Sequence, residues 1–134
     1  MEQNLIDFIK KNDGADTSAL LLGKNRYPDI DIHTAVRCID GRKTIKEKVP
    51  QWYLCPSLLY PSHLPLEQCS SQITALHKQK YIPQRAKVAD LTGGFGIDTY
   101  FISEKASFVD YFEQNSELAE IAEKRNLKGE MVLV

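Results

Sequence analysis

The stretch that decides the fold is Asp90-Leu91-Thr92-Gly93-Gly94-Phe95-Gly96, which joins an apolar run to a segment free of glycine and proline. The apolar residues Val88, Ala89 and Leu91 predict a buried strand, and Ile97 to Ser103 predict a helix. Closely spaced glycines let the backbone approach a bound molecule, and an acid at the strand end offers it a negative partner. The stretch therefore indicates a small-molecule site that favours positive charge.

Two kinds of phosphate-binding loop are excluded by the residues around the glycines. A nucleoside-triphosphate loop ends in Gly-Lys-Ser/Thr, but Gly96 is followed by Ile97 and Asp98. A dinucleotide loop reads G-x-G-x-x-G/A, whereas Thr99 occupies the third small position here, and acids on both flanks would repel a pyrophosphate. S-adenosylmethionine carries an ammonium, a sulfonium and no phosphate, so it suits a loop flanked by Asp90 and Asp98.

The loop resembles motif I of class I S-adenosylmethionine-dependent methyltransferases, D-x-T/G-x-G-x-G. Residues 106–111 then predict a second strand that ends at Phe112-Glu113. Glu113 follows Asp90 at about the 20-residue separation at which Rossmann-like folds present an acid to a ribose. The resemblance predicts these cofactor-binding residues: Asp90, Thr92, Gly93, Gly94, Phe95, Gly96 and Glu113.

The resemblance also implies a role for each part of this site. Gly94 and Gly96 line the methionine portion through their backbone, Asp90 orients the ammonium, Glu113 holds the ribose, and Phe95 covers one side. Asp98 either favours the helix dipole or touches the ligand. The alternative is that the glycines serve only for close packing between strand and helix. Residues on the methyl-acceptor side have no counterpart in the chain, so no catalytic residue is predicted.

A second resemblance lies ahead of the loop. Residues 61–71, Pro-Ser-His-Leu-Pro-Leu-Glu-Gln-Cys-Ser-Ser, are similar to the segment before motif I in a bacterial group of methyltransferases that carry a THUMP-like domain. THUMP domains bind RNA, so this resemblance implies an RNA substrate. The basic segment Arg42 to Lys48, beside Trp52 and Tyr53, either contacts RNA or forms a solvated surface turn.

The predicted fold class is α/β, with a helical region at residues 1–85 and a partial Rossmann-like cofactor-binding domain at residues 86–134. A helix capped by Asn115 or Ser116 and a third strand at Met131 to Val134 would complete the first half of such a sheet, with about three parallel strands. A methyltransferase sheet has about seven strands. We therefore expect a truncated, inactive form that self-associates through an exposed sheet edge.

Short helices are predicted throughout residues 1–85. Their apolar spacing places them at residues 5–9, at 17–22 before Gly23, at 32–39 before Gly41, and from Pro65 to Tyr81. The proline-rich aromatic stretch at residues 49–61 is too apolar for a free linker; it is interpreted as packed core, and the alternative is a surface that stacks on bases or faces a substrate. A helical region of this size could fold alone and dock on a partner. The alternative to a methyltransferase is therefore a noncatalytic helical interaction module with a relic glycine turn.

Composition sets the outer limits. The chain is 43% hydrophobic with a net charge of −1, and no apolar run reaches the length of about 18 residues needed for a membrane helix. With no signal-like start, a cytoplasmic location is expected. Three widely spaced cysteines argue for reduced thiols, and the three histidines lack metal-ligand spacing, so no metal site is predicted.

Overall fold

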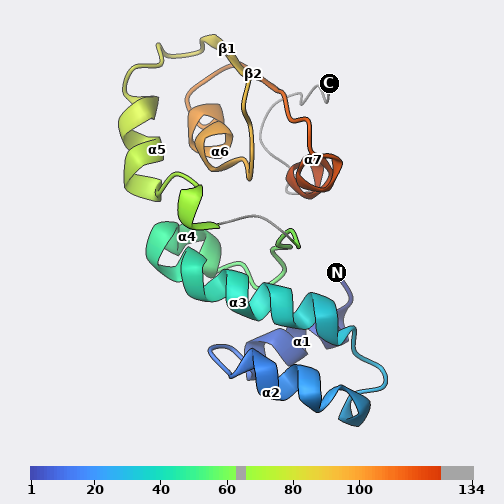
Figure 1. Cartoon of the computed structure of the whole chain (residues 1–134). Helices are drawn as coiled ribbons and strands as arrows, with labels where there is room; N and C mark the ends of the chain where they lie inside the picture. The colour runs from blue at the N-terminus through green and yellow to red at the C-terminus, as the bar shows by residue number, and fades with distance from the viewer. Residues whose placement is uncertain (63–65, 125–134) are drawn as a thin grey trace. The chain divides into compact units, whose positions relative to one another are not determined.

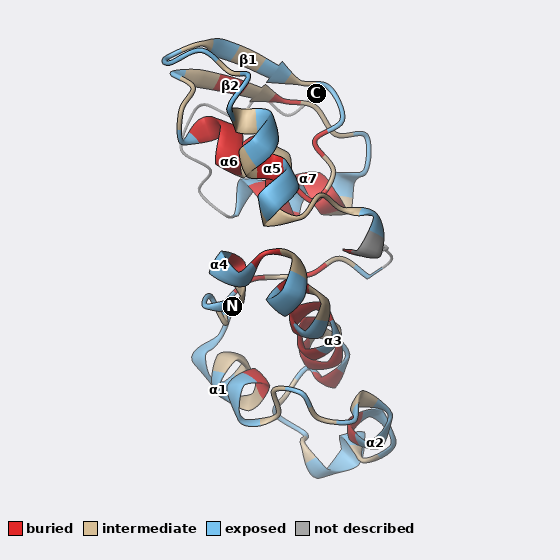
Figure 2. Cartoon of the chain, turned by 90° about the vertical axis from the view of Figure 1, so that its left-hand side faces the viewer, coloured by how far each residue is buried: buried red, intermediate tan, exposed pale blue. Residues whose placement is uncertain are grey.

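The structure, a computed structural model, describes residues 1–62 and 66–124 (Figure 1). The chain divides into two compact units, Met1–Leu66 and Glu67–Val134. Buried residues concentrate on α3 in the first unit and on α6 in the second (Figure 2). No helix in the described part of the chain combines the length and apolar character needed to cross a membrane.

The described residues of the first unit form helices and their connecting segments, with no strand. Its elements are α1 (Gln3–Lys11), α2 (Thr17–Leu22), the 3-10 turn η1 (Lys24–Arg26), α3 (Ile32–Lys48) and α4 (Pro50–Tyr53). Helix α2 begins where the Asp16 carboxylate accepts a hydrogen bond from the Ser18 amide, and it ends at Gly23 as predicted. Asp31 caps α3 in the same way through the Thr34 amide.

Helix α3 does not end at Gly41, which corrects the prediction. It continues to Lys48, because an interior glycine costs a helix only about 1 kcal/mol and tertiary packing outweighs that cost. Gly41 lies against the ring of Tyr60, and a β-carbon at this position would stand 2.3 Å from Cδ1 of that ring. The glycine therefore marks a close helix contact rather than a helix end.

The aromatic stretch forms core, as interpreted. Val49, Trp52, Leu58 and Tyr60 are all buried, and so is Ile39 of α3. The proline at the first position of α4 fits a helix start, because that position needs no amide donor. This stretch therefore belongs to the hydrophobic core of the helical unit.

The basic segment is the second half of α3, so it is not a surface turn. The Arg42 side chain is 7% exposed and forms two bonds to the Asp13 carboxylate, Nε to Oδ1 at 3.2 Å and Nη2 to Oδ2 at 2.9 Å. Its Nη1 donates to the Tyr53 carbonyl at 3.0 Å, and the guanidinium lies 4.4 Å from the centroid of the Tyr53 ring. Arg42 thus joins the loop after α1 to α4.

This contact makes the stability of the helical unit sensitive to acid. The Arg42 hydrogen bond, helped by the Tyr53 hydroxyl against the opposing effect of burial, lowers the pKa of Asp13 from its ordinary value of 3.8. The ionised carboxylate therefore stabilises the fold above pH 3.8, and this contribution is lost as the pH falls through the lowered pKa. Asp13→Asn is expected to flatten the dependence of stability on pH in this acidic window.

Urea unfolding followed by the fluorescence of Trp52, the only tryptophan, measures this dependence from about pH 5 to about pH 2. Some slope should remain in the variant, because the Thr34 hydroxyl bond also lowers the pKa of Asp31. Equal slopes in Asp13→Asn and the unchanged protein would contradict the role of Asp13.

The second unit is a parallel strand pair with helices. Its elements are α5 (Gln72–Gln79), β1 (Lys87–Asp90), α6 (Ile97–Ser103), β2 (Phe108–Tyr111) and α7 (Ser116–Glu123), preceded by the 3-10 turn η2 (Leu66–Gln68) at the division between the units. The register runs from Lys87 opposite Phe108 to Asp90 opposite Tyr111. The order β1-α6-β2 is the strand-helix-strand unit that the sequence predicts, and Asn115 caps α7.

Two details of this unit differ from expectation. Strand β1 is not buried in the described residues: Lys87 and Ala89 are exposed and Leu91 is 73% exposed, whereas β2 contributes the buried Val109 and Tyr111. The described sheet has two strands, and the predicted third strand at residues 131–134 lies outside the described residues. Self-association through the sheet edge therefore stays a prediction.

The division between the units falls after Leu66 and not after residue 85. Helix α5 belongs with α6, because Lys78 forms an ion pair with Asp98 at 2.6 Å and the Gln79 amide donates to the Phe101 carbonyl. The helix predicted from Pro65 to Tyr81 is interrupted where the Ser71 hydroxyl caps α5. Pro65 itself lies outside the described residues.

Candidate functional site

The glycine loop and the end of β2 meet at one edge of the strand pair. Because β1 and β2 are parallel and Asp90 stands opposite Tyr111, residues 91–96 and 112–115 leave the sheet side by side. The Phe112 amide donates to the Asp90 carbonyl at 2.9 Å, and the Gly93 amide donates to the Phe112 carbonyl at the same distance. The chain thus brings together the two segments that the sequence assigned to one site.

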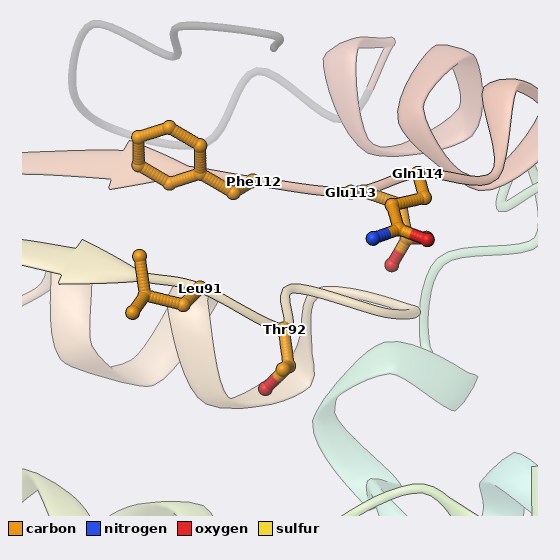
Figure 3. A pocket seen from close by; sticks show the side chains of 5 residues that line it. All are labelled: Leu91, Thr92, Phe112, Glu113 and Gln114. Carbon is orange, nitrogen blue, oxygen red and sulfur yellow. The ribbon is translucent and has the colours of Figure 1, made fainter.

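An open pocket of about 540 Å³ lies at this edge. Leu91 and Thr92 line it from the glycine loop, and Phe112, Glu113 and Gln114 line it from the segment after β2 (Figure 3). Glu113 is the one charged side chain among these lining residues. A negative, partly apolar pocket disfavours phosphate and suits a nucleoside or a cationic group.

Glu113 is held in place by two backbone amides. Its Oε2 accepts from the Gly94 amide at 2.7 Å, and its Oε1 accepts from the Asn115 amide at 2.8 Å. Each carboxylate oxygen has a second lone pair, so each can accept one further hydrogen bond from a ligand. This arrangement fits an acid that binds two neighbouring hydroxyl groups.

The described contacts of Asp90 are with the protein itself. Its Oδ1 accepts from the Thr92 amide at 3.2 Å, which closes a turn at the strand end. Its Oδ2 accepts from the Thr99 hydroxyl at 2.5 Å, and Thr99 is 1% exposed. Asp90 therefore ties β1 to α6, and it does not line the pocket.

The bond between Thr99 and Asp90 was not predicted from the sequence. In the sequence, Thr99 was used only as evidence against a dinucleotide loop, because it stands where that pattern has glycine or alanine. The pattern that could have predicted the bond is an acid before the glycine loop, Asp90, and a hydroxyl after it, Thr99.

The three glycines of the loop are required for two different physical reasons, backbone conformation and close packing. Gly94 and Gly96 have φ values of +55° and +81°, a region that residues with a β-carbon rarely adopt. Gly93 serves packing instead, because a β-carbon there would stand 2.0 Å from Cε2 of Tyr111. Gly93 is thus packed closely against β2, while the other two glycines set the course of the loop, and the role of all three in binding stays a prediction.

Asp98 lies where one of its two expected roles, favouring the dipole of α6, places it, whereas Phe95 does not line the pocket. Phe95 is 3% exposed and is not among the residues that line the pocket, so its position favours the core over a cover for the ligand. Asp98 lies in the first turn of α6 and accepts bonds from Lys78 at 2.6 Å and from the Ser70 hydroxyl at 2.8 Å. These contacts fasten the segment before the loop to the helix after it.

Tyr111 is a site component that sequence reasoning missed. It appeared in the sequence only as the last residue of a strand. In the structure it is fully buried, and its hydroxyl donates to the Gly94 carbonyl at 2.5 Å.

Among the described residues, no group of three His, Cys, Asp or Glu side chains is placed to hold a metal ion.

Comparison with known proteins gives one match in structure. No protein-family model matches the sequence, and no curated protein matches it. The crystal structure of a "putative methyltransferase" from Porphyromonas gingivalis W83 superposes with a TM-score of 0.79 at 32% sequence identity. The match covers 97% of this chain and 34% of that one, so the chain spans about a third of the length of that protein. The chain thus has the fold of the corresponding part of that methyltransferase.

Proposed function

We propose that the protein is an S-adenosylmethionine-dependent methyltransferase whose cofactor nucleoside binds at the ends of β1 and β2. The observation that carries this proposal is the Glu113 carboxylate, which lines the pocket and is oriented by the amides of Gly94 and Asn115. The likeness in fold to a methyltransferase supports it. Motif I, whose glycines adopt positive φ beside the pocket, supports the choice of cofactor.

The residues present fit this cofactor. Glu113 has acceptor capacity for both ribose hydroxyls, and the apolar side chains of Leu91 and Phe112 flank the same pocket. The bound cofactor would supply an activated methyl group on a sulfonium. The chain's own contribution is to orient the nucleoside, because much of the rate of such a displacement comes from alignment.

RNA is the proposed methyl acceptor. The support is the resemblance of residues 61–71 to the segment before motif I in methyltransferases with a THUMP-like domain. Part of that segment now has a structural role beside motif I, since Ser70 bonds Asp98 and Ser71 caps α5. The basic segment of α3 adds less support, because Arg42 is buried and paired with Asp13.

Calorimetric titration with S-adenosylhomocysteine tests the cofactor. The protein at its full natural length is expected to bind, and Glu113→Gln is expected to weaken binding about tenfold or more, because it removes charged acceptors for two hydroxyls. Glu120→Gln is the matched control, since Glu120 is an exposed acid on α7. The same titration on the 134-residue chain tests the expectation that this length binds weakly or not at all.

Transfer of a labelled methyl group to total RNA or total protein identifies the acceptor class. Failure of the full-length protein to bind S-adenosylhomocysteine would remove the methyltransferase proposal and favour the helical interaction module. Cofactor binding with label only in protein would overturn RNA as the acceptor.

A further inference from the structure

The end of β2 bonds both backbone groups of Gly94, its carbonyl and its amide, which belong to the two peptide groups on either side of the α-carbon. The Tyr111 hydroxyl donates to the Gly94 carbonyl at 2.5 Å, and the Glu113 carboxylate accepts from the Gly94 amide at 2.7 Å. Between them, the Phe112 carbonyl accepts from the Gly93 amide at 2.9 Å. Three consecutive residues of one segment therefore each bind the glycine loop.

Tyr111 makes a second contact with the loop through its ring. The ring fills the space where a β-carbon of Gly93 would lie, 2.0 Å from Cε2. The side chain is 0% exposed and does not line the pocket, so a ligand in the pocket would not reach it. Any effect of Tyr111 on a ligand must pass through the loop.

We propose that Tyr111 is a positioning residue for the donor site: its hydroxyl fixes the Gly94 carbonyl and thereby the backbone conformation of Gly94, and the amide of Gly94 in turn orients Glu113. This inference rests on the proposed function. Glycine has more conformational freedom to lose than any other residue, and Gly94 is held at one of the several φ values open to it, +55°. Ordering this residue before the ligand arrives removes that loss from the binding step.

The orientation of Glu113 depends on the backbone conformation of Gly94. If the φ and ψ angles of Gly94 change, its amide moves away from Oε2, and the carboxylate keeps only the Asn115 amide on Oε1. Two ribose hydroxyls need both oxygens at fixed positions. The hydroxyl of a buried tyrosine therefore controls the geometry of an acid that faces the pocket.

Tyr111→Phe in the full-length protein tests this role, because it keeps the ring against Gly93 and removes the bond to Gly94. S-adenosylhomocysteine affinity is expected to fall about tenfold, because a part-buried carbonyl loses its donor and Gly94 is no longer held before the ligand binds. Val109→Ala is the matched control. Val109 is a buried residue of the same strand, 3% exposed, that stands opposite Val88 of β1, and its truncation lowers stability without removing a hydrogen bond to the loop.

A second readout separates positioning from a general loss of structure. In spectra of the amide groups without ligand, the signals of Gly93, Gly94 and Gly96 should shift or broaden in Tyr111→Phe and stay in place in Val109→Ala. Equal loss of affinity in both variants, or an unchanged affinity in Tyr111→Phe, would overturn the proposal. If the unchanged protein binds no S-adenosylhomocysteine, the proposed function fails first, and the glycine signals still decide whether the hydroxyl holds the loop.

Discussion

Gly93→Ala is expected to destabilise the second unit by about 3 kcal/mol, at the upper end for an overpacked core. The added β-carbon would stand 2.0 Å from Cε2 and 2.4 Å from Cδ2 of Tyr111. That ring cannot turn aside cheaply, because it is fully buried and its hydroxyl is bonded to Gly94. Thermal unfolding followed by circular dichroism measures the loss, and cofactor affinity should fall with it.

Gly14→Ala is the comparison variant, because a β-carbon there meets no atom within 4 Å. Its φ of +79° still strains an alanine, so a loss of about 1 kcal/mol is expected. The double variant Gly93→Ala with Tyr111→Val should recover part of the stability, since the smaller side chain leaves room for the methyl group. A Gly93→Ala protein as stable as Gly14→Ala would show that Tyr111 yields easily and contradict the tight packing.

Arg42→Ala is expected to destabilise the helical unit by about 3 kcal/mol. Removal of one partner from a largely buried ion pair leaves the other charge without compensation, and such losses are about 3–5 kcal/mol. The lower end applies because the Asp13 side chain keeps 22% of its exposure to water. The bond to the Tyr53 carbonyl and the stacking on the Tyr53 ring are lost as well.

Lys43→Ala is the matched control on the same helix. Lys43 pairs with Asp40 at 3.1 Å, but both side chains are about half exposed, at 44% and 51%. Exposed pairs contribute about 1 kcal/mol at most, so little change is expected. Arg42→Lys should lie between the two, because an ammonium cannot form the paired bonds of a guanidinium. Urea unfolding followed by Trp52 fluorescence compares the three, and equal midpoints would contradict the importance of Arg42.

Local patterns predicted most of the helices and strands. Gly23 ends α2, residues 97–103 form α6, and Asn115 caps α7, because each depends on contacts within a few residues of chain. The prediction was wrong at Gly41, where the residue allows contact with Tyr60, distant in sequence. The same local pattern, glycine after an apolar run, has a different cause in each case.

The candidate site shows the same contrast. The sequence places Thr92 and Glu113 on the segments that the structure brings to one pocket, because parallel strands end at a common edge. It assigned Phe95 to the ligand, whereas the fold buries that ring. The roles of Thr92, Glu113 and Phe95 in binding the cofactor stay predictions, which titration with S-adenosylhomocysteine tests.

By itself, the sequence determined the order of strand, glycine loop, helix and second strand, since apolar spacing, caps and glycines act over short distances. Only the tertiary structure decided which groups those residues meet. It paired Arg42 with Asp13 and set Tyr111 against Gly93 and Gly94. Such contacts join residues far apart in the chain, and their partners depend on how whole elements pack, which no local pattern encodes.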